Sequence, residues 1–388
     1  MKILHVISSI DPANGGPPVV ATRLAAAQAS IGHEVHLLTY TAPGREEAIE
    51  NSLDGLPGRE LIRFHTIKPM TRAESFTGSN AKKMLDELCP QMDFVHGHNV
   101  WDTTIRKMSQ ACSKHQVPYT ICLHGMLDPW CMTQRRMKKA IALKLGYRAA
   151  LVGCRFIHCL NKDEIGFVKV HNFGTALETI PNGIFIEEFE PPPEKGVFRA
   201  NHPEIGDKPY IFFLSRLHYK KGLDFLAEAF SAVADEFPEA MLVVAGPDGG
   251  AQADFEQRIA SAGLSDRVLV TGPIYGDGKL EALIDSTCFC LPSRQEGFSI
   301  AITESLALGV PVVVTNACHY PEVTEVNAGI ETELSVESIA SGLRKTLEAT
   351  QDELALQGSN GMNLIRERFT WPIVAKQTIE LYKKYSTK

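Results

Sequence analysis

The chain has 388 residues, enough for two or three domains, and 44% of them are hydrophobic. Its formal net charge is -7, from 39 lysines and arginines against 46 aspartates and glutamates, which excludes an overall electrostatic attraction to nucleic acid. No apolar run approaches the ~20 residues of a membrane-spanning helix. Nine cysteines without a C-x-x-C pair indicate buried, reduced thiols and a cytoplasmic protein, and no signal-peptide pattern follows the first residues.

Short apolar runs alternate along the chain with amphipathic stretches of helical length, a pattern typical of parallel sheets in α/β folds. The proline-rich, charged segment Glu190–Gly196 interrupts the alternation and indicates a linker. We therefore predict two doubly wound, Rossmann-like domains that divide near this segment. The predicted strands are 3–8, 34–39, 94–98, 119–123, 155–160 and 177–180 before it, and 210–214, 241–245, 268–271, 288–292 and 312–315 after it.

The first candidate binding segment is Asn14–Pro18, between the first predicted strand and a helix. Ligands of doubly wound sheets bind at the carboxyl ends of strands. Gly15 and Gly16 allow the backbone to approach a ligand closely, and a helix start attracts an anion. A plain turn explains the segment equally well, and the absence of G-x-G-x-x-G gives no support for a dinucleotide site.

The second candidate segment is Ser215–Gly222, which follows the first strand of the second domain. Arg216 and Lys221 are two cations at a strand end, and they suit a pyrophosphate whose negative charge grows as a glycosidic bond breaks. A solvated basic loop is the alternative.

The third candidate segment runs from Pro292 to Glu304, again from a strand end into a helix. The backbone N–H groups of residues 297–299 would be offered to a ligand. Glu304 lies among apolar residues, where an acceptor for ribose hydroxyls would explain a carboxylate. The alternative is a half-exposed glutamate on a helix.

The segment PSRQEGFSIAITESLALGVPVVVTN closely resembles the E-x(7)-E region of retaining glycosyltransferases with the GT-B fold, of the family-4 type. SRLHYKKG matches the family's R-x(4)-K-G element, and Gly15–Gly16, IPNGI and FTWPIVAKQTIELY match further family segments in order. The resemblance implies two domains facing a central cleft, with a C-terminal helix that crosses back to the first. The predicted domains are 1–195 together with 371–388, and 196–370.

The resemblance also implies an activity: transfer of a hexosyl group from a nucleotide diphosphate sugar to a glycan or lipid-linked acceptor, with retention of configuration. Arg216 and Lys221 would bind the pyrophosphate, Glu304 the ribose, and Glu296 the donor sugar, which His124 would contact from the other side. The implied catalytic set is His124, Arg216, Lys221 and Glu296. The implied donor-binding set is Gly15, Gly16, Arg216, Lys221, Ile274, Tyr275, Glu296, Gly297, Phe298, Ser299 and Glu304.

Two departures from the family pattern leave the donor sugar open: Ser299 replaces a commoner glycine, and 317–322 lacks the paired glycines of many members. The segments HGHNVW and HGMLDPW look like those of a subgroup that acts in surface-polysaccharide or lipopolysaccharide assembly. From them we predict acceptor-side roles for His96, His98, Trp101 and Asp128.

His96 and His98 could also ligate a metal, but no third ligand has a useful spacing, so a hydrogen-bonded or acceptor-site role is favoured. The chain contains no D-x-D motif, so we expect no metal cofactor, with Arg216 and Lys221 in its place. Two other functions stay open: a nucleotide-sugar epimerase of the same fold, and a non-catalytic nucleotide-sugar-binding protein.

Residues 132–148, MTQRRMKKAIALKLGYR, hold six basic residues and no acidic one. Met137, Ala140, Ile141, Leu145 and Ala149 fall at helical spacing, which predicts an amphipathic helix with a cationic face. Peripheral contact with an anionic membrane, on its inner face and near a lipid-linked acceptor, is one interpretation. A solvated helix face is the other.

Overall fold

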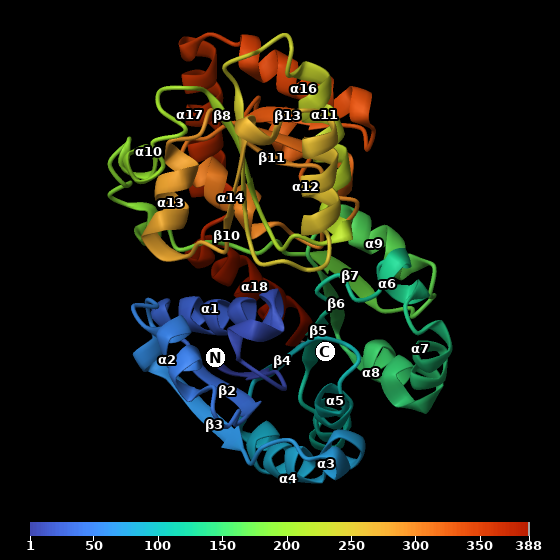
Figure 1. Cartoon of the computed structure of the whole chain (residues 1–388). Helices are drawn as coiled ribbons and strands as arrows, with labels where there is room; N and C mark the ends of the chain where they lie inside the picture. Colours follow the sequence, from blue (N-terminus) through green and yellow to red (C-terminus); the bar gives the residue numbers. More distant parts are fainter. Residues whose placement is uncertain (387–388) are drawn as a thin grey trace. The chain divides into compact units, whose positions relative to one another are not determined.

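The computed structural model describes residues 1–386 and shows two compact units, each built on one parallel sheet with helices packed against it (Figure 1). The first unit contains Met1–Asn182 and the C-terminal segment from Trp371, and the second contains Gly183–Thr370. The predicted α/β class with two Rossmann-like sheets is confirmed.

The sheet of the first unit has seven strands in the order β3-β2-β1-β4-β5-β6-β7. The order reverses between β1 and β4, the place where doubly wound sheets open a binding crevice. The strands are β1 (Lys2–Val6), β2 (Glu34–Tyr40), β3 (Ile62–Ile67), β4 (Phe94–His98), β5 (Tyr119–Cys122), β6 (Phe156–Cys159) and β7 (Ala176–Thr179). The main helices are α1 (Gly16–Ser30), α2 (Glu46–Leu53), α3 (Arg72–Thr77), α4 (Ser79–Leu88), α5 (Thr103–His115), α9 (Lys162–Lys169) and α18 (Trp371–Ser386).

The sheet of the second unit has six strands in the order β10-β9-β8-β11-β12-β13, with the same kind of reversal between β8 and β11. Its central strands, such as MLVVA in β9, are fully buried because helices cover both faces. The strands are β8 (Tyr210–Leu214), β9 (Met241–Ala245), β10 (Val268–Gly272), β11 (Cys288–Leu291), β12 (Val312–Thr315) and β13 (Gly329–Thr332). The helices are α10 (Val197–Asn201), α11 (Leu223–Val233), α12 (Gln252–Ser261), α13 (Gly276–Ile284), α14 (Ile300–Ala307), α15 (Glu322–Glu325), α16 (Val336–Glu348) and α17 (Gln351–Arg368).

The predicted strands agree with the observed ones to within two residues, but the prediction omits β3 and β13. Both are edge strands of their sheets. In β3 only the first and last residues, Ile62 and Ile67, are buried, so the sequence IRFHTI lacks the continuous apolar run that marks a central strand.

The boundary between the units lies at Asn182, earlier than the predicted division after residue 195. The Ile184 amide donates to the Phe369 carbonyl at 2.9 Å, and Phe189 is buried in the core of the second unit. The Gly196 amide donates to Asp285 at 2.6 Å. The proline-rich segment therefore packs as part of the second unit instead of standing between two domains.

Helix α18 belongs to the first unit although it is the last element of the chain. It packs beside α1, and Trp371, Val374 and Tyr382 on its inner face are fully buried. The Tyr382 ring stacks on Phe94 of β4 with 4.3 Å between ring centroids. The C-terminal helix is therefore part of the core of this unit.

The basic stretch 132–148 is not the single helix that the periodicity predicts. It is divided among α6 (Pro129–Thr133), α7 (Arg136–Ala142), the π-helical turn η4 (Leu143–Tyr147) and the start of α8 (Arg148–Gly153). The breaks occur at Arg135, which has a φ of 53°, and at Gly146, which has a φ of 108°. None of the helices within residues 1–386 has the length and apolar character needed to cross a membrane.

Candidate active site

A cavity of about 320 Å³ opens in the second unit at the carboxyl ends of its central strands. The segments after β8, β9, β10 and β11 line it together with the start of α14. This is where a doubly wound sheet binds its ligand. The predicted donor-binding residues that line it are Arg216, Lys221, Ile274, Tyr275, Glu296, Phe298, Ser299 and Glu304. Gly297 lies in the same loop.

Glu296 is the buried anion of the cavity, with 8% of its surface exposed. Its Oε1 atom accepts from Lys221 Nζ at 2.6 Å and from the Ser293 hydroxyl at 2.6 Å. A buried carboxylate needs such partners, because losing its hydration without them would cost several kcal/mol. Lys221 has three donors, so it can keep Glu296 and still donate to a phosphate.

Glu304, in α14, is also paired: its Oε1 atom lies 2.6 Å from Lys279 Nζ of α13. Lys279 lines the cavity and was not predicted. Nothing in the local sequence of α13 distinguishes this lysine from a surface lysine. Lys279 pairs with Glu304 only because the fold places α13 and α14 at one cavity.

Arg216, by contrast, is exposed and has no ion-pair partner within the described part of the chain. Its aliphatic stem lies close to Gly249, where an added Cβ would come within 3.0 Å of Arg216 Cγ and Cδ. Arg216 therefore presents an uncompensated positive charge to the cavity, and Lys221 and Lys279 present charges that carboxylates already balance.

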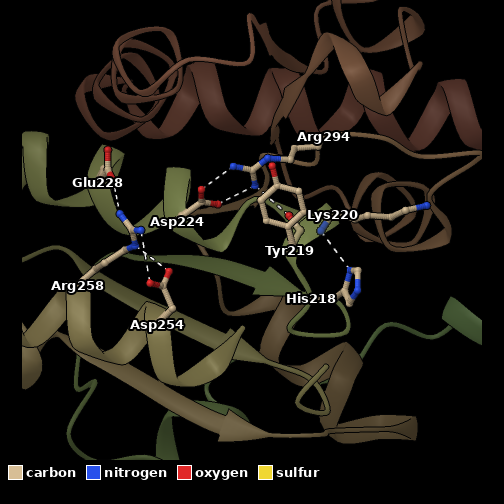
Figure 2. A network of polar contacts seen from close by, with 8 residues as sticks. All are labelled: His218, Tyr219, Lys220, Asp224, Glu228, Asp254, Arg258 and Arg294. Atoms are coloured by element: carbon tan, nitrogen blue, oxygen red, sulfur yellow. Dashed lines mark hydrogen bonds and ion pairs between the residues drawn. The ribbon is translucent and has the colours of Figure 1, made fainter. Parts of the chain in front are cut away.

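Arg294 connects the loop after β11 to the loop after β8, and Figure 2 shows its side chain against Asp224 and Tyr219. The Arg294 amide donates to the Lys220 carbonyl at 2.7 Å, and its guanidinium donates to both Asp224 oxygens at 2.7 and 2.5 Å. The guanidinium also lies 4.0 Å from the centroid of the Tyr219 ring. Arg294 thus fixes the loop after β11 against the loop after β8.

The same two loops meet at Gly222, which has a φ of 71°. A Cβ built there would lie 1.9 Å from the Pro292 carbonyl oxygen, so only glycine fits. Ser299 supplies the N-cap of α14, with its hydroxyl accepting from the Ile302 amide at 3.5 Å. The serine that departs from the family pattern therefore has a structural use in this chain.

In the first unit, Gly15 precedes α1 with a φ of 94° and Gly16 is its first residue, with open space around both. The Gly15 amide donates to the Pro12 carbonyl at 3.1 Å. Pro17 and Pro18 have no N–H, so Gly16 supplies the backbone donor at the start of the helix.

The predicted acceptor-side residues of the first unit have partners of their own. Asp128 is buried and caps α6, accepting from the Trp130 amide at 2.8 Å, and Trp101 Nε1 donates to the Met126 carbonyl at 3.3 Å. His96 and His98 are fully buried, and an acceptor-side role for them stays a prediction. They are hydrogen-bonded, and His98 Nδ1 lies 3.2 Å from His124 Nε2.

The structure also supplies the third histidine that the local spacing lacks. His5 of β1 joins His96 and His98, and the three can place ligand atoms within 4.8 Å of one another. His5 lies in register with His96 on the neighbouring strand. Sequence reasoning misses His5 because 91 residues separate the two and only strand pairing brings them together.

Five histidines of the first unit have a lowered pKa that favours the neutral imidazole at physiological pH: His5, His96, His98, His124 and His158. Burial lowers the pKa of His5 and His158 to about 4 and that of His124 to about 3. Burial, reinforced by the neighbouring histidines, lowers the pKa of His96 and His98 well below the usual 6.5. Neutral imidazole offers one donor and one acceptor, so each ring can take part in a directed chain of hydrogen bonds.

Two family models match consecutive parts of the chain. Residues 14–188 match the model described as Glycosyltransferase Family 4, and residues 194–360 match the one described as Glycosyl transferases group 1. The chain belongs to the family-4 type of GT-B glycosyltransferases.

Individual relatives are distant from this glycosyltransferase. It is 25% identical to an uncharacterized glycosyltransferase of Methanocaldococcus jannaschii, over 99% of this chain and 98% of that one. It is 29% identical to a subunit of the human phosphatidylinositol N-acetylglucosaminyltransferase over 54% of this chain, but it spans only 41% of that protein. It is 27% identical to a Mycobacterium tuberculosis GDP-mannose-dependent alpha-(1-6)-phosphatidylinositol monomannoside mannosyltransferase, over 56% of this chain and 58% of that one.

Solved structures share the fold. The crystal structure of Anabaena HepE in complex with UDP and glucose superposes with a TM-score of 0.76 at 18% identity, over 99% of this chain and 100% of that one. WaaG, described as a glycosyltransferase involved in lipopolysaccharide biosynthesis, gives 0.69 at 16% identity, over 98% and 99%. These likenesses establish the GT-B fold of the glycosyltransferase.

The Arg294 contacts predict that Arg294→Ala lowers turnover on the order of a hundredfold, because a displacement of about 1 Å at catalytic groups has that effect. Arg258 is the matched control, since it also binds two carboxylates, Asp254 and Glu228, but joins α11 to α12 outside the cavity (Figure 2). Arg258→Ala should stay within about twofold of the parent, because exposed ion pairs contribute little. Steady-state kinetics of both variants checks this, and equal losses would contradict it.

The neutral histidines predict that the first unit loses stability as the pH falls from 6.5 toward 4. In that window the histidines of the unfolded chain bind protons, whereas those of the folded unit stay neutral. Each histidine therefore lowers the free energy of unfolding by at most about 1 kcal/mol per pH unit. Burial raises the pKa of Glu164 to about 7, and this shift acts in the opposite direction. It involves one titrating group, whereas five histidines act to lower the stability. Urea unfolding followed by tryptophan fluorescence measures this, because Trp101, Trp130 and Trp371 all lie in the first unit. Equal midpoints at pH 7 and pH 5 would contradict it.

Proposed function

We propose that this glycosyltransferase moves a hexosyl group from a nucleotide diphosphate sugar to a glycan or lipid-linked acceptor, with retention of configuration. The observation that carries the proposal is the cavity of the second unit, where exposed Arg216 lies beside the Lys221–Glu296 ion pair at the strand ends. Two cations and a buried carboxylate suit a donor with a charged diphosphate and an uncharged sugar.

The leaving group is a nucleoside diphosphate, and its negative charge grows as the bond to the sugar breaks. Arg216 meets that charge without first giving up a partner, and Lys221 meets it while keeping Glu296 in place. Interactions that strengthen in this way lower the barrier for the chemical step, since they bind the transition state better than the substrate. Glu304 is proposed to bind the ribose, and His124 and the Gly16 amide to contact the sugar and a phosphate.

The acceptor hydroxyl is proposed to attack from the face that the leaving group vacates, with the departing phosphate taking its proton. No metal is required in this proposal, because the cations occupy the place that a divalent ion takes in D-x-D enzymes. Two of the relatives act, as their names state, on phosphatidylinositol or its monomannoside. That supports an acceptor attached to a lipid. A place in the assembly of a surface polysaccharide or lipopolysaccharide is our proposal from the segments HGHNVW and HGMLDPW.

The basic stretch supports the same acceptor class. Met137, Ile141 and Leu145 are 79%, 54% and 62% exposed, so the apolar side chains face solvent instead of the core. Arg135, Arg136, Lys138 and Lys144 make no side-chain hydrogen bond or ion pair with any residue between 1 and 386. Exposed apolar side chains among cations are typical of surfaces that lie on anionic lipid. We propose that this surface contacts the inner face of the membrane.

The assignment of the cavity predicts different kinetic losses at its charged residues. Arg216→Ala should reduce kcat about a hundred- to thousandfold, as loss of one preorganised charge-stabilising donor does. Glu304→Gln should mainly raise KM for the donor, because ribose hydroxyls carry no changing charge. Lys220→Ala is the control, since its Nζ atom binds Gln295 and does not line the cavity.

The measurement is donor consumption with a panel of nucleotide sugars and acceptors, in excess chelator after dialysis, with the anomeric configuration of the product read by NMR. Near-normal kcat in Arg216→Ala would refute the leaving-group assignment, and recovery only with added magnesium or manganese would refute metal independence. Product from donor alone would identify an epimerase. Donor binding without consumption across the panel would identify a binding protein.

The membrane proposal predicts that the protein binds vesicles containing anionic lipid and not neutral ones, and that salt weakens the binding. Replacing Met137, Ile141 and Leu145 by serine should abolish it, because their apolar surface no longer inserts. Leu356→Ser is the control, since Leu356 is 57% exposed in the second unit. Vesicle co-sedimentation checks this, and equal binding to neutral vesicles would leave only the solvated-face interpretation.

A further inference from the structure

Five histidines form a continuous hydrogen-bonded array through the first unit, together with Gln28 and Tyr382. We call this set, His5, His96, His98, His124 and His158 with these two residues, the histidine array. Strand register explains it: His5 pairs with His96, and Cys122 pairs with both His98 and His158. Gln28 comes from α1 and Tyr382 from α18, and both are fully buried.

One end of the histidine array is fixed by a backbone carbonyl. His158 Nε2 lies 2.8 Å from the Ile180 oxygen, which only accepts, so the proton of this ring is on Nε2. In a neutral ring Nδ1 is then an acceptor, and it faces His96 Nε2 at 3.3 Å. His96 therefore also carries its proton on Nε2, and its Nδ1 accepts from the Tyr382 hydroxyl at 2.5 Å.

Tyr382 fixes the donor and acceptor roles in the next hydrogen bonds of the array. Its hydroxyl proton is committed to His96, so its oxygen accepts from Gln28 Nε2 at 3.3 Å. That orients the Gln28 amide with its oxygen toward His5 Nε2 at 2.9 Å, which must carry the proton. His5 Nδ1 then accepts from His98 Nε2 at 3.0 Å, and His98 Nδ1 accepts from His124 Nε2 at 3.2 Å.

The other end of the array is His124. Its Nε2 carries a proton donated to His98, so its Nδ1 is unprotonated. Among residues 1–386 the hydrogen-bonding neighbour of that nitrogen is the Cys122 thiol at 3.8 Å, a weak donor. His124 is partly exposed, whereas the other four histidines are at most 2% exposed. Its Nδ1 atom is thus the one acceptor that the array offers to a ligand.

A metal is the alternative use of these side chains, since His5, His96 and His98 can place ligand atoms within 4.8 Å of one another. A metal bound there would replace the His5–His98 hydrogen bond. The array without a metal already gives each ring nitrogen of the four buried histidines one partner of the correct kind. Buried polar groups in native proteins are satisfied in this way, so we favour the hydrogen-bonded arrangement.

We propose that Tyr382 and Gln28 are positioning residues that hold His124 in its Nε2–H tautomer and so present Nδ1 as an acceptor to a sugar hydroxyl. The functional part of this inference rests on the proposed contact between His124 and the sugar. Without the Tyr382 hydroxyl, the Gln28 amide has no acceptor on that side and is free to rotate. The reversed amide donates to His5 Nε2, and the protons of His5, His98 and His124 move to Nδ1.

The test combines histidine NMR with kinetics on Tyr382→Phe, which keeps the ring that packs on Phe94. Nitrogen-15 spectra of histidine-labelled protein should show His124 as Nε2–H in the parent and a growing Nδ1–H population in the variant. The nitrogen-15 signals that are absent from the spectrum of His124→Ala are assigned to His124. Turnover should fall about tenfold, the effect of one hydrogen bond, with less change in KM for the donor.

Tyr385→Phe is the matched control, because Tyr385 lies on the same helix and donates to Glu178 at 2.7 Å outside the array. It should keep the parent tautomers and turnover. Gln28→Met removes the same link from its other side and should reproduce the change of tautomer if Tyr382→Phe fails to fold.

An unchanged His124 tautomer in both array variants would overturn the inference, as would a stoichiometric transition metal bound to the purified parent through these histidines. The NMR result does not depend on turnover. If the protein shows no transferase activity, the proposed function is refuted. The NMR measurement of the His124 tautomer still tests whether Tyr382 and Gln28 control it.

Discussion

In both units a parallel sheet is covered by helices on its two faces, and this constraint decides where polar chemistry can occur. Central strands such as β9 must be apolar throughout, so charged side chains collect just beyond the carboxyl ends of the strands. The cavity of the second unit is the direct result. Arg216 and Lys221 follow β8, and Glu296 follows β11, on the two strands between which the order of the sheet reverses.

The first unit departs from this rule, since it places histidines inside the sheet. The buried rings are tolerated because each donates and accepts hydrogen bonds within the array. Their lowered pKa values also favour the uncharged form. The last helix of the chain takes part, since Tyr382 closes the array between Gln28 and His96. A C-terminal element thereby becomes connected to a residue with a proposed role at the sugar.

Charge balance also distinguishes the cations of the second unit. Lys221 neutralises the buried Glu296 and Lys279 the half-buried Glu304, and only Arg216 of these three cations is unpaired within residues 1–386. The two ion pairs keep Glu296 and Glu304 in fixed positions without ligand. The diphosphate of the proposed donor would thus meet one cation without a partner and two whose ammonium groups have further donors.

The sequence by itself determined the fold class, every central strand and most residues around the cavity of the second unit. Those features are local, because apolar runs mark buried strands and the short segments after them carry recognisable residues. The edge strands β3 and β13, the unit boundary at Asn182 and the breaks at Arg135 and Gly146 depended on packing. So did the roles of Lys279 and Arg294, whose partners come from other elements. The histidine array was the least predictable feature, because its hydrogen bonds join residues that are 23 to 354 positions apart in the sequence. Only strand register and the packing of α18 in the first unit bring these residues together.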